Sequence, residues 1–165
     1  MEVYRRLVRM LEEEFAIKDY SLYEVGAANN QITPLFADGE QNAPCRWCDP
    51  QILVHSQDCR ARRTEHKADG VLNPGICYTF QLPPEVSARR HICLPIIQSG
   101  AVGNILQLIV APDKENEVAA RIPYITVYLQ ETAPVLEARK LMDTLRESSL
   151  RDPMTTVFSK NMWKP

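Results

Sequence analysis

The chain has 165 residues, a net charge of −2 at pH 7 and 45% hydrophobic residues, which suits one packed domain of ordinary size. This charge balance excludes the basic surface of a nucleic-acid-binding protein, and no apolar run reaches the length of a membrane span or forms a secretory signal. We therefore expect a cytoplasmic protein that binds neither nucleic acid nor membrane. Five cysteines without an export signal favour thiols, metal ligands or a redox site over a disulfide framework.

The N-terminal part of the chain predicts a helix followed by two strands. Residues 2–16 form an amphipathic helix that covers one sheet face, because apolar residues recur at helical spacing. These residues are Tyr4, Leu7, Leu11 and Phe15. Residues 18–25 alternate in character and predict the first strand. Residues 31–36 predict a short second strand, and Pro34 places it toward a sheet edge.

An irregular, cysteine-bearing insert is predicted after the second strand. Residues 38–49 form a polar loop that ends at Asp49, a good helix N-cap followed by proline. Residues 50–63 then predict a helix, and residues 64–75 predict a second polar loop. Residues 76–80 predict a short strand, which the following prolines end.

The centre of the sheet is predicted at residues 91–111. Two apolar runs, 91–97 and 102–111, are joined by 98–101, a glycine-bearing connection of hairpin length. The second run is apolar on both faces, so both faces must be covered. Its two faces carry Leu106, Leu108 and Val110 on one side and Ile105, Gln107 and Ile109 on the other. We expect helices over one face and a ligand chamber over the other; an ordinary buried hairpin without a chamber is the alternative.

The last part of the chain is helical in pattern as far as about residue 150. Pro123 and Pro134 are expected to kink or restart the helix. From residue 134 to 150, apolar residues follow the spacing of a short coiled-coil seam, which predicts a homodimer through parallel C-terminal helices. The seam residues are Ala138, Leu141 and Leu145. Packing of the helix on its own sheet is the alternative for the first half of the segment.

The order of these elements and four short motifs resemble a GAF domain. The motifs are Cys59-Arg-Ala-Arg-Arg63, Cys77, Cys93-Leu-Pro-Ile96 and Gly100-Ala-Val-Gly-Asn-Ile-Leu-Gln-Leu108. They are similar to a series found in bacterial GAF domains upstream of diguanylate cyclase or histidine kinase domains. The resemblance covers about residues 2–135. It implies an α+β (α/β) fold, with an antiparallel sheet of about five or six strands, helices on one face, a ligand-chamber insert on the other and a long C-terminal helix.

A second resemblance lies at residues 150–158, Leu-Arg-Asp-Pro-Met-Thr-Thr-Val-Phe. Asp152, Thr155 and Phe158 are similar to the opening of a GGDEF diguanylate cyclase domain, although Thr156 stands where that family has glycine. The cyclase catalytic region is not in this sequence, so the chain itself is not expected to be an enzyme. The implied organisation is a GAF-like sensor (1–133), a signalling helix or coiled-coil linker (134–150) and an incomplete GGDEF-like start (151–165). We expect a sensory part cut from a larger enzyme; a stand-alone sensor with a decayed tail is the alternative.

The two resemblances together imply a regulatory function. The domain would bind a small ligand, a metal or a redox signal and would control a covalently linked GGDEF domain through a dimeric helix. Two alternatives stay open. One is a small cysteine-dependent redox enzyme resembling the free methionine-sulfoxide reductases, which are also GAF folds. The other is a purely structural dimerisation module.

Four cysteines have the number and chemistry of a zinc site. They are Cys45, Cys48, Cys59 and Cys77, with His55 and His66 as substitutes for either of the last two. The pair Cys45-x-x-Cys48 lets both sulfurs face one centre, and two further soft ligands complete a tetrahedral site. Reduced thiols packed in the interior and a disulfide are the alternatives.

Three further residues are candidates for ligand binding. Cys93 lies in the middle of a predicted strand, where it is either a sensing thiol or haem-type ligand, or a small core residue. His91 shares its face. Arg63, with Arg60 and Arg62, forms a basic helix end that either binds an anionic ligand or faces solvent as a partner of the helix dipole. We find no catalytic triad, carboxylate pair or glycine-rich phosphate loop.

Overall fold

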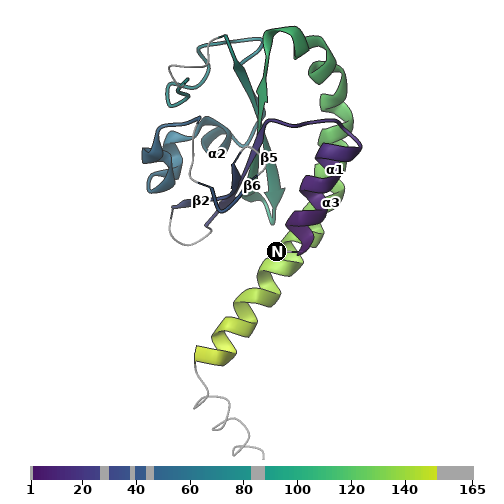
Figure 1. Cartoon of the computed structure of the whole chain (residues 1–165). Helices are drawn as coiled ribbons and strands as arrows, with labels where there is room; N and C mark the ends of the chain where they lie inside the picture. The colour runs from purple at the N-terminus through teal and green to yellow at the C-terminus, as the bar shows by residue number, and fades with distance from the viewer. Residues whose placement is uncertain (1, 27–29, 38–39, 44–46, 83–87, 152–165) are drawn as a thin grey trace, which may run out of the picture.

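The structure is a computed structural model that describes residues 2–26, 30–37, 40–43, 47–82 and 88–151. In these ranges a sheet of six strands has the order β3-β2-β1-β6-β5-β4, and its paired strands are antiparallel (Figure 1). The strands are β1 (Tyr20–Val25), β2 (Ile32–Ala37), β3 (Glu40–Gln41), β4 (Ala68–Asp69), β5 (Arg90–Gln98) and β6 (Ala101–Val110). The helices are α1 (Glu2–Glu13), α2 (Arg60–Thr64) and α3 (Glu115–Arg151). This architecture confirms the predicted fold class.

The β5–β6 hairpin lies near the middle of the sheet, as predicted. Its tight turn consists of Ser99 and Gly100, whose φ angles of 52° and 79° are both positive, as in the turns that match the twist of paired strands. In register, Cys93 lies opposite Gln107, and Leu94 lies opposite Leu106. The hairpin therefore sets which side chains of the two longest strands share a face.

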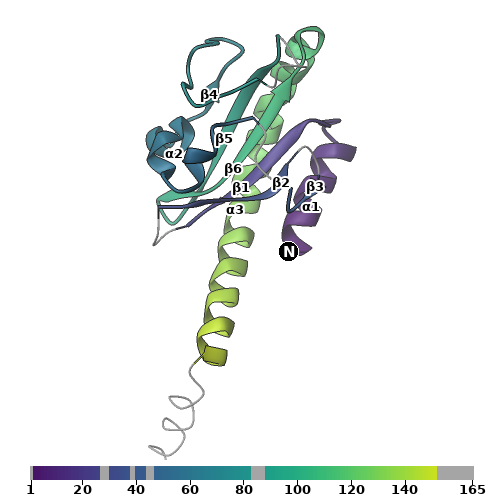
Figure 2. The same ribbon diagram turned by 60° about the vertical axis from the view of Figure 1, so that its left-hand side comes forward.

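Helices α1 and α3 cover one face of the sheet, and the insert with α2 covers the other (Figures 1 and 2). The helix-side core contains large, fully buried side chains such as Leu7, Leu22, Leu106 and Ile125. The insert side holds a second, smaller cluster of Tyr23, Val25, Ile32, Ala61, Ala68, Cys93, Val102 and Ile105. Both faces of β6 are covered, as the apolar character of that strand requires.

The long helix α3 does not restart at either of its two prolines, which was one of the two outcomes predicted for them. Pro123 and Pro134 lie inside one helix that runs without a break from Glu115 to Arg151. Each proline removes one backbone N–H donor. Burial of apolar side chains on both sides of each proline, such as Ile122 with Ile125 and Ala133 with Leu136, holds the chain in one helix instead. Within the described ranges, no helix is long and apolar enough to cross a membrane.

The insert is less regular than predicted. The expected helix 50–63 is wrong: two short 3-10 turns, Pro50–Leu53 and Ser56–Asp58, precede the five-residue α2. Asp49 caps the first turn as predicted, since its side chain accepts a hydrogen bond from the Gln51 N–H at 3.0 Å. The helix cannot continue, because the Ser56 N–H donates to the Asn30 carbonyl at 3.2 Å rather than back along the chain.

One predicted strand and two predicted loops in this region are also corrected. Residues 76–80 do not form a sheet strand; Phe80 instead makes an isolated bridge with Cys48 inside the insert. The sheet strand β4 lies within 64–75, and β3 lies within 38–49, both predicted as loops. Each is two residues long, too short to leave an alternating pattern in the sequence.

Candidate functional site

A polar row crosses the sheet face under the insert. Ser21, Gln107 and Cys93 are direct cross-strand neighbours on β1, β6 and β5. Gln107 is 1% exposed, and its Oε1 accepts a hydrogen bond from the Tyr23 hydroxyl at 3.1 Å. Its Nε2 donates to the Cys48 sulfur at 3.2 Å. One buried amide therefore links the two central strands to the insert.

Four cysteines from separate segments form a thiol cluster at this row: Cys48, Cys59, Cys77 and Cys93. Cys93 is buried, as predicted, whereas the three insert cysteines are half-buried. Burial raises the pKa of Cys93, and the other three thiols raise it further by repulsion between thiolates. Burial also raises the pKa of Cys59, and raises that of Cys77 to about 11. Thiols in such surroundings stay protonated at neutral pH.

The zinc site predicted from the sequence is assembled only in part. Cys45 lies outside the described residues. Cys48, Cys59 and Cys77 belong to the thiol cluster, but no group of three or more Cys, His, Asp or Glu among the described residues is placed to hold a metal ion. His55 is exposed, and His66 contacts the Thr64 carbonyl through Nδ1 at 2.8 Å. Zinc binding therefore stays a prediction in which Cys45 has to take part.

His91 shares the face of Cys93, as predicted, and is 1% exposed. Its ring stacks on Phe80 with centroids 4.2 Å apart, and Gly70 packs so closely that a Cβ there would lie 2.7 Å from Nδ1. Burial lowers the pKa of His91 to about 4, although Asp69 opposes this shift. Its Nε2 is buried without a hydrogen-bond partner in the described structure, as is the Ser21 hydroxyl. Two orphaned polar atoms thus lie on the same sheet face.

Arg63, the third predicted ligand-binding residue, is exposed at the end of α2. Its guanidinium donates to the Gln57 carbonyl at 3.2 Å, within the insert. Its charge nevertheless acts on the thiol cluster, because Arg63 and Arg60 both work against the raised pKa of Cys77. The structure thus places Arg63 at the rim of the cluster, while Cys93 and His91 lie on the sheet.

A second polar group, which the sequence analysis did not predict, holds α3 where it leaves the sheet. The Lys140 ammonium donates to the Gly103 carbonyl on β6 at 2.6 Å, and burial lowers the pKa of this lysine. The Ser99 hydroxyl in the hairpin turn donates to the Glu137 carboxylate. These two contacts, which we call the exit latch, fasten the helix to the β5–β6 hairpin.

A buried network lies beside the exit latch. Asn104 is fully buried, accepts from the Gln98 amide at 2.7 Å and donates to the Tyr4 hydroxyl at 3.2 Å. Tyr4 in turn donates to the Glu24 carboxylate at 2.9 Å, and burial raises the pKa of Tyr4. Asn104 and Gln107 are polar residues inside an apolar strand, which is a sequence signal for a buried hydrogen-bond network.

Beyond the exit latch, α3 presents an apolar stripe to solvent. Leu141 and Leu145, two of the predicted seam residues, are 59% and 62% exposed. The stripe reaches the side opposite the buried face of α3, since Leu145 follows the buried Leu136 by nine residues, or about two and a half turns at roughly 100° per residue. Other exposed apolar side chains of the helix are Tyr124, Val127, Val135 and Met142.

Among the described residues, two of the cavities lie elsewhere. One of about 610 Å³, which we call the edge groove, lies between α3 and the outer edge of β5, with residues 65–67 at its border. The other, of about 300 Å³, lies beside 16–19 and the end of β6. Neither is lined by a member of the thiol cluster.

Comparisons with known proteins identify the fold. No family model matches the sequence, and no curated protein matches it. Among solved structures, the GAF domain/HD domain protein from Geobacter sulfurreducens is similar at 14% identity, over 85% of this chain and 93% of that one, with a TM-score of 0.57. A methyl-accepting chemotaxis protein, residues 122 to 287, is similar at 12% identity, over 85% and 88%, with a TM-score of 0.58. The chain therefore has a GAF-like fold.

Proposed function

We propose that this chain is the regulatory sensor domain of a larger cytoplasmic signalling protein and is not itself an enzyme. Residues 1–133 form the sensor, 134–150 form the signalling helix, and 151–165 begin a GGDEF output domain that makes cyclic di-GMP. The matching motif residues of that output domain, Asp152, Thr155 and Phe158, lie outside the described part of the chain. The GAF-like fold and the chemotaxis-protein neighbour support the sensory role.

The observation that carries the proposal is the course of α3. The helix packs on the sheet as far as Leu136, which is 1% exposed, and is fastened once more by Lys140. From residue 141 to 148 every residue is exposed, although three of them are large and apolar: Leu141, Met142 and Leu145. A helix that carries an apolar stripe past its own domain requires a partner for that stripe. We propose that the partner is the same helix of a second copy.

The signal passes through the exit latch. A stimulus on the sheet changes the activity of a linked domain only if it favours one arrangement of α3 over another. Lys140 and Glu137 join α3 to the β5–β6 hairpin, and that hairpin also carries Cys93 and His91 on the face under the insert. A ligand, metal or redox change at the thiol cluster, with Arg63 at its rim, therefore acts on the same two strands that hold the helix.

The raised pKa values of Cys59, Cys77 and Cys93 favour binding of a ligand or metal over both a redox signal at these thiols and the alternative of a redox enzyme. A catalytic cysteine needs a lowered pKa, so that the thiolate is available as the nucleophile. Burial instead raises the pKa of Cys59, Cys77 and Cys93. Turnover of free methionine sulfoxide by the purified chain, lost when any one of these residues is changed to serine, would reverse this preference.

Sedimentation of the purified chain tests the dimer. Leu145→Asp places a charge in the exposed apolar stripe and should shift the equilibrium toward monomer. Thr144→Asp introduces the same charge one position away, on another side of the helix, and should leave the dimer in place. A chain that stays monomeric at high micromolar concentration, or a Thr144 variant that dissociates equally, would contradict the proposed seam.

The linkage to an output domain is tested in the longer protein. Seven residues inserted after Glu147 preserve the phase of a coiled coil, whereas four residues rotate the two ends of the helix relative to each other. We expect regulated synthesis of cyclic di-GMP to survive the first insertion and to change after the second. Equal behaviour of the two insertion variants would show that α3 is a passive tether.

A further inference from the structure

We propose that the edge groove between α3 and β5 binds an amphipathic organic anion, with its apolar body between the helix and the strand and its carboxylate at Lys67. This binding site lies on the helix side of the sheet, away from the thiol cluster. The binding itself does not depend on the proposed signalling function.

The groove exists because the β4–β5 ladder stops early. Among the described residues, the register of this ladder contains only Ala68 and Asp69, opposite Cys93 and Ile92. The Gly70 N–H donates to the His91 carbonyl at 2.7 Å, so His91 and the residues at even spacing from it direct their backbone groups toward β4. Pro95 follows His91 and Cys93 in that series, and it has no N–H to donate to a further residue of β4. The edge beyond Cys93 therefore stays open, and residues 65–67 border a groove instead of extending the strand.

The walls of the groove are apolar. Its floor is formed by Leu94 and Ile96 of β5, 3% and 2% exposed, packed against Leu129 and Ala133 of α3, 3% and 7% exposed. Ile97, which is 41% exposed, adds accessible apolar surface to the lining. A volume of about 610 Å³ lies within the usual range for small-molecule sites. The helix and the sheet are already in contact at the floor of the groove, so an apolar ligand above that floor lies against both without unfolding either.

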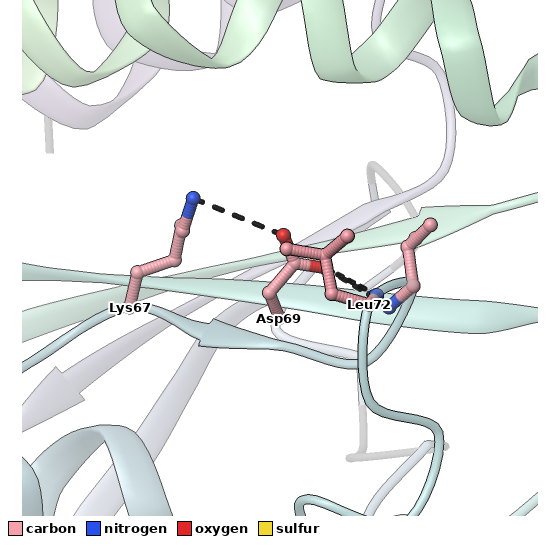
Figure 3. Close-up of polar contacts among 4 residues, drawn as sticks. Lys67, Asp69 and Leu72 are labelled. Carbon is pink, nitrogen blue, oxygen red and sulfur yellow. Dashed lines mark hydrogen bonds and ion pairs between the residues drawn. The ribbon is translucent and has the colours of Figure 1, made fainter.

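One end of the groove carries a cation that is only loosely engaged. The Lys67 and Asp69 side chains rise from the strand layer toward α3 (Figure 3). The Lys67 ammonium lies 3.8 Å from Asp69 Oδ2, too far for a hydrogen bond, and the Lys67 side chain is 46% exposed. Asp69 Oδ1 is held by the N–H groups of Val71 and Leu72 at 2.9 and 3.1 Å. Lys67 is therefore able to donate to a ligand carboxylate while Asp69 stays in place.

Glu65 and His66, which also line the Lys67 end of the edge groove, limit where the carboxylate of a ligand can lie. Glu65 lines the groove with a charge that opposes an anion, and His66 lies between it and Lys67. An anionic ligand must therefore place its carboxylate on the Lys67 side. Glu65→Gln removes the opposing charge and should strengthen binding of the anion.

Calorimetric titration with decanoate and decanol, each below its aggregation concentration, separates the contribution of the head group from that of the chain. We expect saturable decanoate binding that Lys67→Met weakens roughly threefold to tenfold, with decanol affected much less. Arg146→Met removes a positive charge from the exposed end of α3 and should change neither affinity. No saturable binding of decanoate, or an equal loss for both compounds, would overturn the assignment.

Filling the groove tests its position. Ala133→Phe should abolish decanoate binding, whereas Val135→Phe, at a residue that is 53% exposed on another side of the same helix, should preserve it. Because a buried alanine can be overpacked, Thr126→Phe at the half-buried border of the groove provides a second test, with folding of each variant checked by circular dichroism. Retained binding in a folded groove-filling variant would refute the site. Binding confined to dilute monomer would assign the groove to a second copy, which also overturns the proposal.

Discussion

The buried imidazole of His91 predicts a specific dependence of stability on pH. Its pKa is lowered from 6.5 to about 4, chiefly because burial disfavours the charged ring. Between these two values the unfolded chain binds a proton that the folded chain does not. The stability contributed by the neutral ring is therefore complete above pH 6.5 and is lost as the pH falls toward 4. The difference of about 2.5 in pKa, at about 1.36 kcal/mol for each unit, gives about 3 kcal/mol at most.

Urea denaturation between pH 7 and pH 4 measures this contribution. The free energy of unfolding of the parent chain should fall more steeply with decreasing pH than that of His91→Gln. Between pH 7 and pH 4, the difference between the two free energies should change by up to about 3 kcal/mol. Carboxylates that titrate in the same range cancel in this comparison. His55→Gln removes an exposed imidazole and should follow the parent curve. Parallel curves for the parent chain and His91→Gln would refute the reasoning.

Three further predictions concern packing, thiol reactivity and metal binding. Leu136→Ala, at a residue 1% exposed, should lower the free energy of unfolding by about 2 to 5 kcal/mol. Leu141→Ala, at a residue 59% exposed, should cost well under 1 kcal/mol per monomer in urea melts of dilute protein; equal losses would place both residues in the core. Cys93 should resist iodoacetamide in the native state and react once the chain is unfolded, as followed by peptide mass spectrometry; rapid native alkylation would mean an open site. Freshly purified protein should contain zinc that Cys45→Ser and Cys48→Ser each remove, and chelation should loosen the insert before the sheet; protein that purifies without metal and takes up none would contradict the zinc site.

The regular elements of the sheet could be predicted from the sequence because their patterns are local. Alternation in 18–25 and the apolar run at 102–111 predicted strands that the structure places at 20–25 and 101–110, and Gly100 marked the hairpin turn. The heptad-like spacing of Leu141 and Leu145 predicted an apolar stripe, which the structure places in solvent. In each case the periodicity of the side chains is fixed by the backbone geometry of a strand or helix.

The candidate site could be predicted only where it depends on the local geometry of a strand. The burial of Cys93 on one face with His91 followed from the alternation of a strand. The partners of Cys93 did not, because Gln107 reaches it through strand register and Cys48 through an irregular insert. The contact of Lys140 with β6 could not be predicted from the sequence, since its acceptor is a backbone carbonyl 37 residues away in the chain.

Three features depend on the tertiary structure: the course of the insert, the continuity of α3 through its prolines and the presence of the edge groove. The Ser56 N–H donates to the Asn30 carbonyl instead of to a carbonyl of the predicted helix, and no local sequence pattern indicates this contact. Pro123 remains inside α3 because the side chains around it are buried against the sheet. Local sequence thus determined where each regular element could form and which of its faces is apolar. Hydrogen bonds and buried surface between distant segments determined which elements continue, where the β4–β5 ladder ends and which polar groups meet, because their free energies exist only once the chain has folded.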